Sequence, residues 1–142
     1  MLKRLFTFFV IFVVSLTALA ACGGETTTTA SWTTSGTLTN IRNDDSWQLS
    51  VDRANGHIRR DVTMTQEQLD MLHVWSWNSE GQSRLTLIQG STEIEIDLTG
   101  GAQGFLITSG LEPGSVRMRL DFEGATDIDV EIRWQASGLF FN

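Results

Sequence analysis

From Trp32 to the C-terminus, the chain consists of short runs in which hydrophobic and polar residues alternate. A period of two places side chains of one kind on one face of a β-strand, whereas an amphipathic helix repeats every 3.6 residues. The runs are separated by Gly, Asn, Asp and Ser, which are common in turns. The pattern therefore predicts a mainly β protein.

The segment 47–64 is predicted to form a β-hairpin around Asn55 and Gly56. This dipeptide tolerates the positive φ angles of a type I′ turn. The resulting register pairs Trp47 with Met64 and gathers the hydrophobic residues of both strands on one face. A slip by one residue would destroy this match.

A second hairpin is predicted over 116–134, with residues 124–126 as its loop. In this register Phe122 lies opposite Ile128, and each apolar residue of one strand meets an apolar residue of the other. Cross-strand pairs of this kind stabilise an antiparallel sheet.

The remaining pattern predicts more strands and one short helix. Thr65 and Gln68 have the spacing of a capping box at the start of a helix over 66–72. Further strands are expected at 37–42, 74–78, 84–89, 93–98 and 105–108. With no long helix to cover them, about nine strands predict an antiparallel β-sandwich, either immunoglobulin-like or jelly-roll-like; a closed barrel is the alternative. The tail 135–142 ends in hydrophobic residues, which we expect to pack on the sandwich or cover a sheet edge.

The first 21 residues have the composition of an export signal. Lys3 and Arg4 precede an apolar run over 5–16, and small residues follow. A membrane-spanning helix needs about 20 apolar residues, so the run favours a cleaved helical signal peptide over 1–21.

The sequence Leu19-Ala20-Ala21-Cys22 resembles the lipobox of bacterial lipoproteins. This resemblance implies that Cys22 becomes the first residue and carries fatty acyl chains such as palmitate. Because Gly23 stands where Asp would signal retention in the inner membrane, the resemblance implies the outer membrane of a diderm or the outward face of a monoderm membrane. Residues 22–31 are then a lipidated cysteine and flexible linker, and 32–142 the folded domain.

The charge balance excludes some partners. The chain has 10 Lys and Arg against 17 Asp and Glu. Removing residues 1–21 takes away Lys3 and Arg4, which leaves 8 − 17 = −9. An acidic domain of this kind is not expected to bind nucleic acid or anionic lipid.

The sequence does not contain a recognisable catalytic or zinc motif. His57 and His73 have no metal-ligand spacing, Cys22 is the sole cysteine, and no Gly-x-Ser-x-Gly elbow is present. We therefore expect a protein without enzymatic activity and without a cofactor.

Two tryptophans provide the candidate ligand site. Trp75 and Trp77 share one strand face with His73. If exposed, the two indoles would form a platform on which sugar rings stack. If buried, they would belong to the core. The sequence favours burial, because Val74, Ser76 and Asn78 on the opposite face would make a poor core.

Four carboxylates provide the candidate metal site. The second predicted hairpin sets Asp121 opposite Asp129 and Glu123 opposite Asp127. Ca²⁺ would relieve the repulsion between these pairs. A solvated turn is the favoured interpretation, because the chain has no Asp-x-Asp-x-Asp-Gly loop.

The segment 107–118, with its Gly-Leu-Glu-Pro-Gly turn, resembles the entry to a strand in bacterial extracytoplasmic β-sandwich domains. Together with the lipobox, this resemblance implies a lipoprotein of the cell envelope, held to the membrane through Cys22. The expected function is that of a binding or protein-interaction module. The alternative is a carbohydrate-binding module, with or without calcium, that recognises a polysaccharide.

Overall fold

A computed structural model describes residues 30–135, which form an antiparallel β-sandwich. Within these residues there are seven strands and one short helix, so the fold class is confirmed and the expected nine strands are too many. The elements are β1 (Ala30–Arg42), β2 (Ser46–Met64), α2 (Gln66–Asp70), β3 (His73–Trp77), β4 (Glu80–Gln89), β5 (Thr92–Asp97), β6 (Ala102–Phe105) and β7 (Gly114–Arg133).

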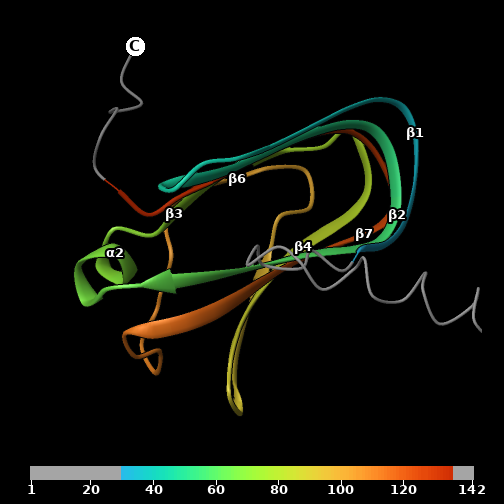
Figure 1. The fold of residues 1–142 in the computed structure, drawn as a ribbon. Helices are drawn as coiled ribbons and strands as arrows, with labels where there is room; N and C mark the ends of the chain where they lie inside the picture. Colours follow the sequence, from blue (N-terminus) through green and yellow to red (C-terminus); the bar gives the residue numbers. More distant parts are fainter. Residues whose placement is uncertain (1–29, 136–142) are drawn as a thin grey trace, which may run out of the picture.

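Two long strands build both layers of the sandwich. Strands β2 and β7 have 19 and 20 residues and pair antiparallel along almost their whole length. Both curve from one layer into the other, together with β1 (Figure 1). The first half of β7 pairs with β4, which pairs with β5, and its second half pairs with β3, which pairs with β6. We call these the β4–β5 layer and the β3–β6 layer.

The bend is made where glycines in neighbouring strands lie together. Gly56, Gly81 and Gly124 all have positive φ angles, of 101°, 77° and 57°. The backbone N–H of Gly124 donates to Asn55 Oδ1 at 2.6 Å, which ties β7 to β2 at this point. The register of β2 against β7 shifts between Ala54 and Gly56. Such irregularities bend a strand and increase its twist.

The two predicted hairpins are therefore wrong. Trp47 pairs with Ile132 of β7 rather than with Met64, and Phe122 pairs with Gly56 and Ser83 rather than with Ile128. Asn-Gly accommodates positive φ in a bend as well as in a hairpin turn. The alternation could not separate the two, because either arrangement places the same residues on the inner face.

Two predictions that involve residues close in sequence agree with the structure, and a third is displaced along the chain. Strands β4 and β5, which match the strands expected at 84–89 and 93–98, form a hairpin around Gly90 with Gln89 opposite Thr92. Helix α2 begins with a complete capping box, in which Thr65 Oγ1 and the Gln68 side chain each bind the other residue's backbone N–H. The strand expected at 105–108 corresponds to β6, which covers 102–105 instead.

The core fills the space between the layers. Its buried hydrophobic residues come from β2, β3, β4, β7, α2 and the loops, and include Trp47, Leu72, Leu85, Leu120 and Ile132. Trp47 and Trp134 are part of the core: both are buried, and their indole N–H groups donate to Asn40 Oδ1 and to the Asp44 carbonyl. At one edge, the Arg60 guanidinium of one layer lies 5.1 Å from the ring centroid of Trp134 in the other, a cation–π contact. Burial lowers the pKa of Arg60 from its usual value.

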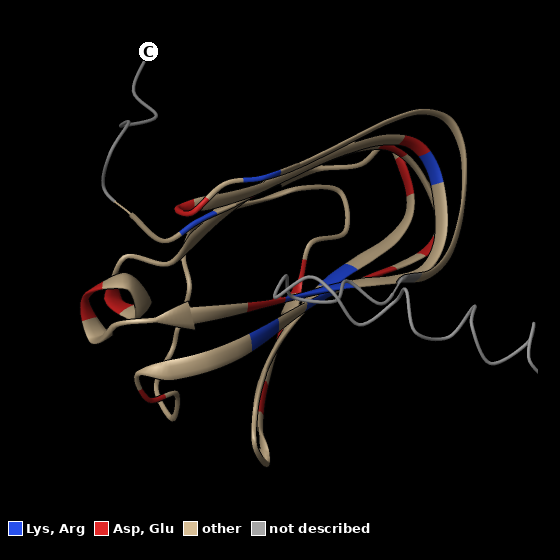
Figure 2. Cartoon of the chain, in the orientation of Figure 1, with Lys and Arg blue, Asp and Glu red and all other residues tan. Residues whose placement is uncertain are grey.

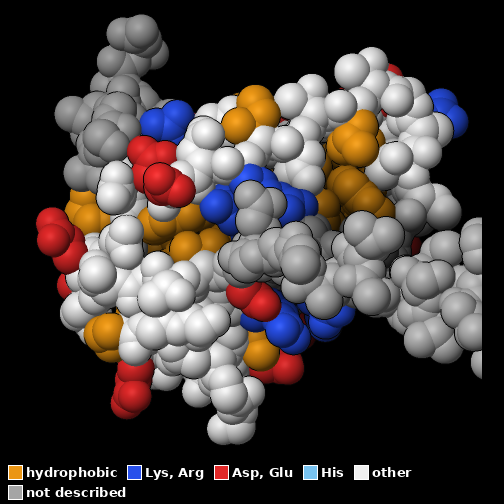
Figure 3. Space-filling model, viewed as in Figure 1, with side chains coloured by type: hydrophobic (Ala, Val, Ile, Leu, Met, Phe, Trp, Pro, Cys, Tyr) orange, Lys and Arg blue, Asp and Glu red, His pale blue; other side chains and the backbone are white. Residues whose placement is uncertain are grey.

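Charge is spread over both layers. Arginines are interspersed with acidic residues along the strands (Figure 2). From this side, hydrophobic side chains reach the surface in separate patches among polar atoms (Figure 3).

The predicted signal peptide, lipidated Cys22 and most of the linker lie outside the described residues, as does most of the tail 135–142. Strand β1 already begins at Ala30, two residues before the expected start of the domain. Among residues 30–135, no helix has the length and apolar character needed to cross a membrane.

Candidate functional site

Strand β3 exposes both of its indoles to solvent. Trp75 and Trp77 have 42% and 52% of their surface accessible, whereas Val74 and Ser76, on the opposite face of the strand, are buried. The interpretation that favoured buried indoles is therefore wrong. Single exposed hydrophobic side chains are common in folded proteins, so two tryptophans exposed on one strand face make β3 the candidate site.

Two polar side chains, Ser76 and Asn78, are buried on the inner side of β3 and of the residue that follows it. Both are hydrogen-bonded there. Ser76 Oγ accepts from the backbone N–H of Ala102 at 3.0 Å. The Asn78 amide donates to the carbonyls of Glu80 and Gly81 and accepts from Ser83 Oγ and the Gly100 N–H. An asparagine side chain offers two donors and two acceptor positions, so Asn78 is fully satisfied. Residues that looked unsuitable for a core thus turn the indoles outward.

Two more rings extend the exposed surface. Phe105 of β6 lies directly opposite His73, with ring centroids 5.6 Å apart, and is 70% exposed. His73 Nδ1 lies 2.9 Å from the Met71 carbonyl, which can only accept, so this nitrogen carries the proton. We call His73, Trp75, Trp77 and Phe105 the aromatic face.

Polar side chains flank the central indole. Trp75 lies between Gln103 of β6 and Glu131 of β7 in a row across the sheet, and Gln48 of β2 follows Glu131. Residues directly opposite each other in neighbouring strands share a face of the sheet. Glu131 Oε1 accepts from Gln48 Nε2 at 3.0 Å and from Arg133 Nε. The carboxylate beside Trp75 is therefore held in position from two sides.

The second indole has a carboxylate on one side and a glycine on the other. Trp77 lies opposite Asp129 of β7. On the β6 side, Gly101 lies beside the indole, and a Cβ added there would be 3.4 Å from Trp77 Cε3. The aromatic face combines flat apolar rings with hydrogen-bonding groups at their edges.

The four carboxylates considered as the alternative calcium site do not come together. Asp121 lies opposite His57 and Arg84 in the β4–β5 layer, whereas Asp129 lies opposite Ser50 and Trp77 in the other layer. Asp121 pairs with Arg119 at 2.8 Å. Asp127 Oδ2 accepts from Ser79 Oγ at 2.6 Å, and Glu123 lies opposite Gln82. Within 30–135, no group of three or more His, Cys, Asp or Glu residues is placed to hold a metal ion.

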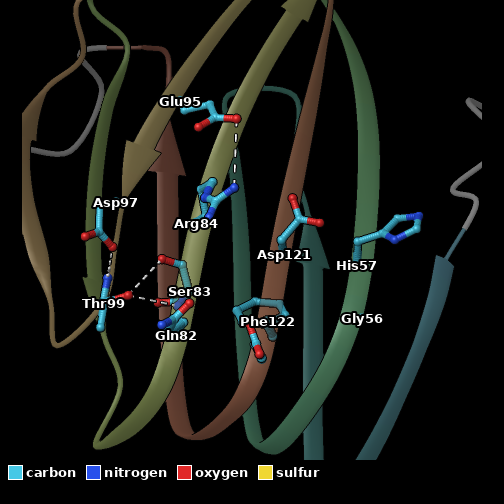
Figure 4. Close-up of a pocket in the computed structure, with 11 residues that line it drawn as sticks. Gly56, His57, Gln82, Ser83, Arg84, Glu95, Asp97, Thr99, Asp121 and Phe122 are labelled. Atoms are coloured by element: carbon cyan, nitrogen blue, oxygen red, sulfur yellow. Dashed lines mark hydrogen bonds and ion pairs between the residues drawn. The ribbon is translucent and has the colours of Figure 1, made fainter.

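The outer side of the β4–β5 layer has a polar hollow of about 760 Å³ (Figure 4). His57, Asp121, Arg84 and Asp97 cross it as one row on four neighbouring strands. Three of its charged groups have partners: Arg84 lies 3.8 Å from Glu95, and hydrogen bonds from Thr99 lower the pKa of Asp97. Phe122 contributes to the lining but is buried. The residues that line the hollow therefore offer hydrogen bonds but no exposed phenyl or indole ring on which a ligand could stack.

The site residues that the sequence did not indicate are Phe105, Gln103, Glu131 and Gln48. Their alternation is visible in the sequence, but only the pairing of β6, β3, β7 and β2 places them around Trp75. Knowledge of strand order would have been needed to find them.

Comparisons with known proteins yield one weak likeness. Searches with protein-family models and among curated proteins found no match. A solved structure, described as TmCBM61 in complex with β-1,4-galactotriose, is similar with a TM-score of 0.37 and 17% identity. The alignment covers 68% of this chain and 66% of that chain, just under two thirds. What the aromatic face binds therefore has to be inferred from its own residues.

Proposed function

We propose that this protein is a non-catalytic carbohydrate-binding lipoprotein that binds a glycan chain on the aromatic face. The observation that carries the proposal is the exposure of Trp75 and Trp77 side by side on one face of β3. The lipobox supports a location at the cell surface, where polysaccharides are the abundant polymers.

The geometry suits sugar rings. Successive side chains on one strand face are about 7 Å apart, since a strand rises about 3.3 Å per residue. This is the scale of one sugar residue, so consecutive rings of a glycan can stack on consecutive indoles. The electron-rich face of an indole attracts the positively polarised C–H groups of a sugar ring.

The edges of the face supply the second requirement. A sugar ring has an apolar face and a rim of hydroxyl groups, and each hydroxyl both donates and accepts. Gln103 and Glu131 lie on opposite sides of Trp75, so both sides of a stacked ring meet a hydrogen-bonding group. A purely apolar partner would remove water from these polar groups and offer no hydrogen bonds in exchange, which is unfavourable.

A protein partner in the envelope is the second candidate. It is supported by the hydrophobic residues Ile41 and Ile107, which are also exposed. A protein interface would need a broad patch, of roughly 800 Å² on each partner. A glycan needs only the rings themselves.

The proposal is tested by tryptophan fluorescence of the full-length chain in a detergent without a sugar headgroup. We expect a saturable change with at least one of a panel of β-glucan, galactan, mannan and xylan. Trp75→Ala and Trp77→Ala should each weaken binding about tenfold or more, which corresponds to ~1.4 kcal/mol. Leu38→Ala removes an exposed hydrophobic side chain of β1 and serves as the matched control.

A response to none of these polysaccharides would refute carbohydrate binding by this face. A response that Trp75→Ala and Trp77→Ala leave unchanged would place the glycan elsewhere on the molecule. Circular dichroism of each variant establishes that it is folded.

A further inference from the structure

We infer that the aromatic face selects glycans without acidic groups, and that the Glu131 and Asp129 carboxylates of β7 beside the two indoles together make this selection. The inference rests on the proposed function and names the class of ligand. It is drawn from three features: the position of Glu131, the way its carboxylate is held, and the charge next to it.

The first feature is the position of Glu131 in the sheet. Glu131 lies directly opposite Trp75, on the side that faces β7. Asp129 has the same relation to Trp77 two residues away. A glycan that runs along β3 over both indoles therefore passes two carboxylates on the same side. A chain with a carboxylate or sulfate on each sugar would bring like charges together along this side.

The carboxylate is also pre-organised. Its hydrogen bonds from Gln48 Nε2 and Arg133 Nε both end on Oε1. Neither of these two hydrogen bonds uses Oε2. Because the side chain is already held, little further conformational entropy is lost when a ligand binds.

The nearest cation does not reverse this preference. Arg133 lies opposite His73 in the same row of β7 and is paired with Glu131, so the two charges of this pair offset each other beside the aromatic face. Asp129 then leaves the row beside the indoles with a net negative charge. The whole chain adds to this field, since its formal net charge is −7.

Matched pairs of ligands test the inference directly. Each neutral polysaccharide of the panel that carries a primary C6 hydroxyl is compared with its C6-oxidised derivative, in which that hydroxyl has become a carboxylate. The two ligands then share backbone and linkage. For the full-length chain at low salt, we expect the oxidised form of β-glucan to bind at least tenfold more weakly than β-glucan itself, and likewise for galactan and mannan.

The variant Glu131→Gln removes the charge and keeps an acceptor of similar shape. We expect it to bind the oxidised forms at least fivefold more tightly than the wild type does, and the neutral forms within about threefold of wild type. Glu123→Gln is the matched control, since Glu123 is an exposed glutamate of β7 that lines the hollow of the other layer. It should leave both affinities unchanged.

Salt dependence of the wild-type chain gives a second measurement that requires no variant. The screening length falls from about 30 Å at 0.01 M salt to about 3 Å at 1 M. The affinity for an oxidised glycan should therefore rise between these salt concentrations, while that for the neutral glycan stays nearly constant.

The failures can be distinguished. If no neutral glycan binds, the proposed function is refuted, and the inference is refuted as well because it rests on that function. If neutral and oxidised glycans bind equally well at low salt, or the oxidised form binds better, the proposed function stands and the inference is overturned. It is also overturned if folded Glu131→Gln keeps the wild-type ratio of the two affinities.

Discussion

At the scale of single residues, the buried amide of Asn78 determines which face of β3 is exposed. Its four hydrogen bonds connect the end of β3, the turn into β4, Ser83 and the loop before β6. A polar residue so fully bonded can stand in a core without a penalty for lost water. This is also why the exposure of Trp75 and Trp77 could not be read from the sequence. Hydrophobicity ranks Asn78 below an indole, and the bonds that reverse the ranking depend on how the chain folds around the amide: three come from the turn into β4 and Ser83, and one from Gly100, which is 22 residues away.

Replacing Asn78 should destabilise the fold. Asn78→Ala leaves Ser83 Oγ and the Gly100 N–H without their acceptor, and two carbonyls lose their donors. Each buried group left unpaired costs about 1–3 kcal/mol, and partial access of water limits the total, so we expect a loss of about 3 kcal/mol in the free energy of unfolding. Chemical denaturation measures it. Asn43→Ala, which removes one hydrogen bond of an exposed asparagine, should cost less than about 1 kcal/mol. Equal losses for the two variants would show that the Asn78 network does not support the fold.

At the scale of elements, local patterns predicted local structure and failed where a distant strand decided the outcome. The capping box of α2 and the β4–β5 hairpin involve residues close in sequence, and both are present. Strands β2 and β7 also follow the expected alternation, but they pair with each other across distant parts of the chain instead of folding back on themselves. A glycine with positive φ is required by either arrangement, so the turn residues did not reveal which one forms.

The bend can be tested at Gly81 of β4, which lies against Gly124 of β7. Its φ is 77°, and an added Cβ would lie 2.3 Å from the Gly124 carbonyl oxygen, a backbone atom that cannot move aside cheaply. Gly81→Ala should therefore cost about 3 kcal/mol or more in the free energy of unfolding, of which about 1–2 kcal/mol is the positive φ itself. Gly90→Ala is the matched control, because Gly90 also has positive φ but open space around it. We expect only the φ cost there. A Gly81→Ala variant as stable as Gly90→Ala would contradict the close packing of β4 on β7 at the bend.

At the scale of the whole molecule, the proposed anchor and the aromatic face would work together. A flexible linker of about ten residues spans roughly 20 Å, so a domain tethered at Cys22 would meet only glycans close to the membrane. Binding to a polymer with many repeated sites then becomes stronger through high local concentration, even when each contact is weak.

The anchor is tested by metabolic labelling with a palmitate analogue in a bacterial host. We expect label on the full-length chain and none on Cys22→Ser, together with a shift of the variant from the membrane fraction. Thr26→Ala changes a nearby residue of the predicted linker and serves as the control, since it should leave both the label and the fractionation unchanged. A labelled Cys22→Ser chain, or an unlabelled wild type in a host that processes other lipoproteins, would contradict lipidation at this cysteine.

The central claim is that a glycan stacks on the exposed indoles of β3, and nuclear magnetic resonance tests it most directly. In a proton–nitrogen correlation spectrum of the isotopically labelled chain, the five tryptophans give separate indole N–H signals. Titration with the best-binding oligosaccharide of the panel should shift the signals of Trp75 and Trp77. Those of Trp47 and Trp134, whose indole N–H groups are bonded inside the fold, should stay in place. Unchanged signals from Trp75 and Trp77 during saturable binding would contradict the claim and locate the ligand elsewhere.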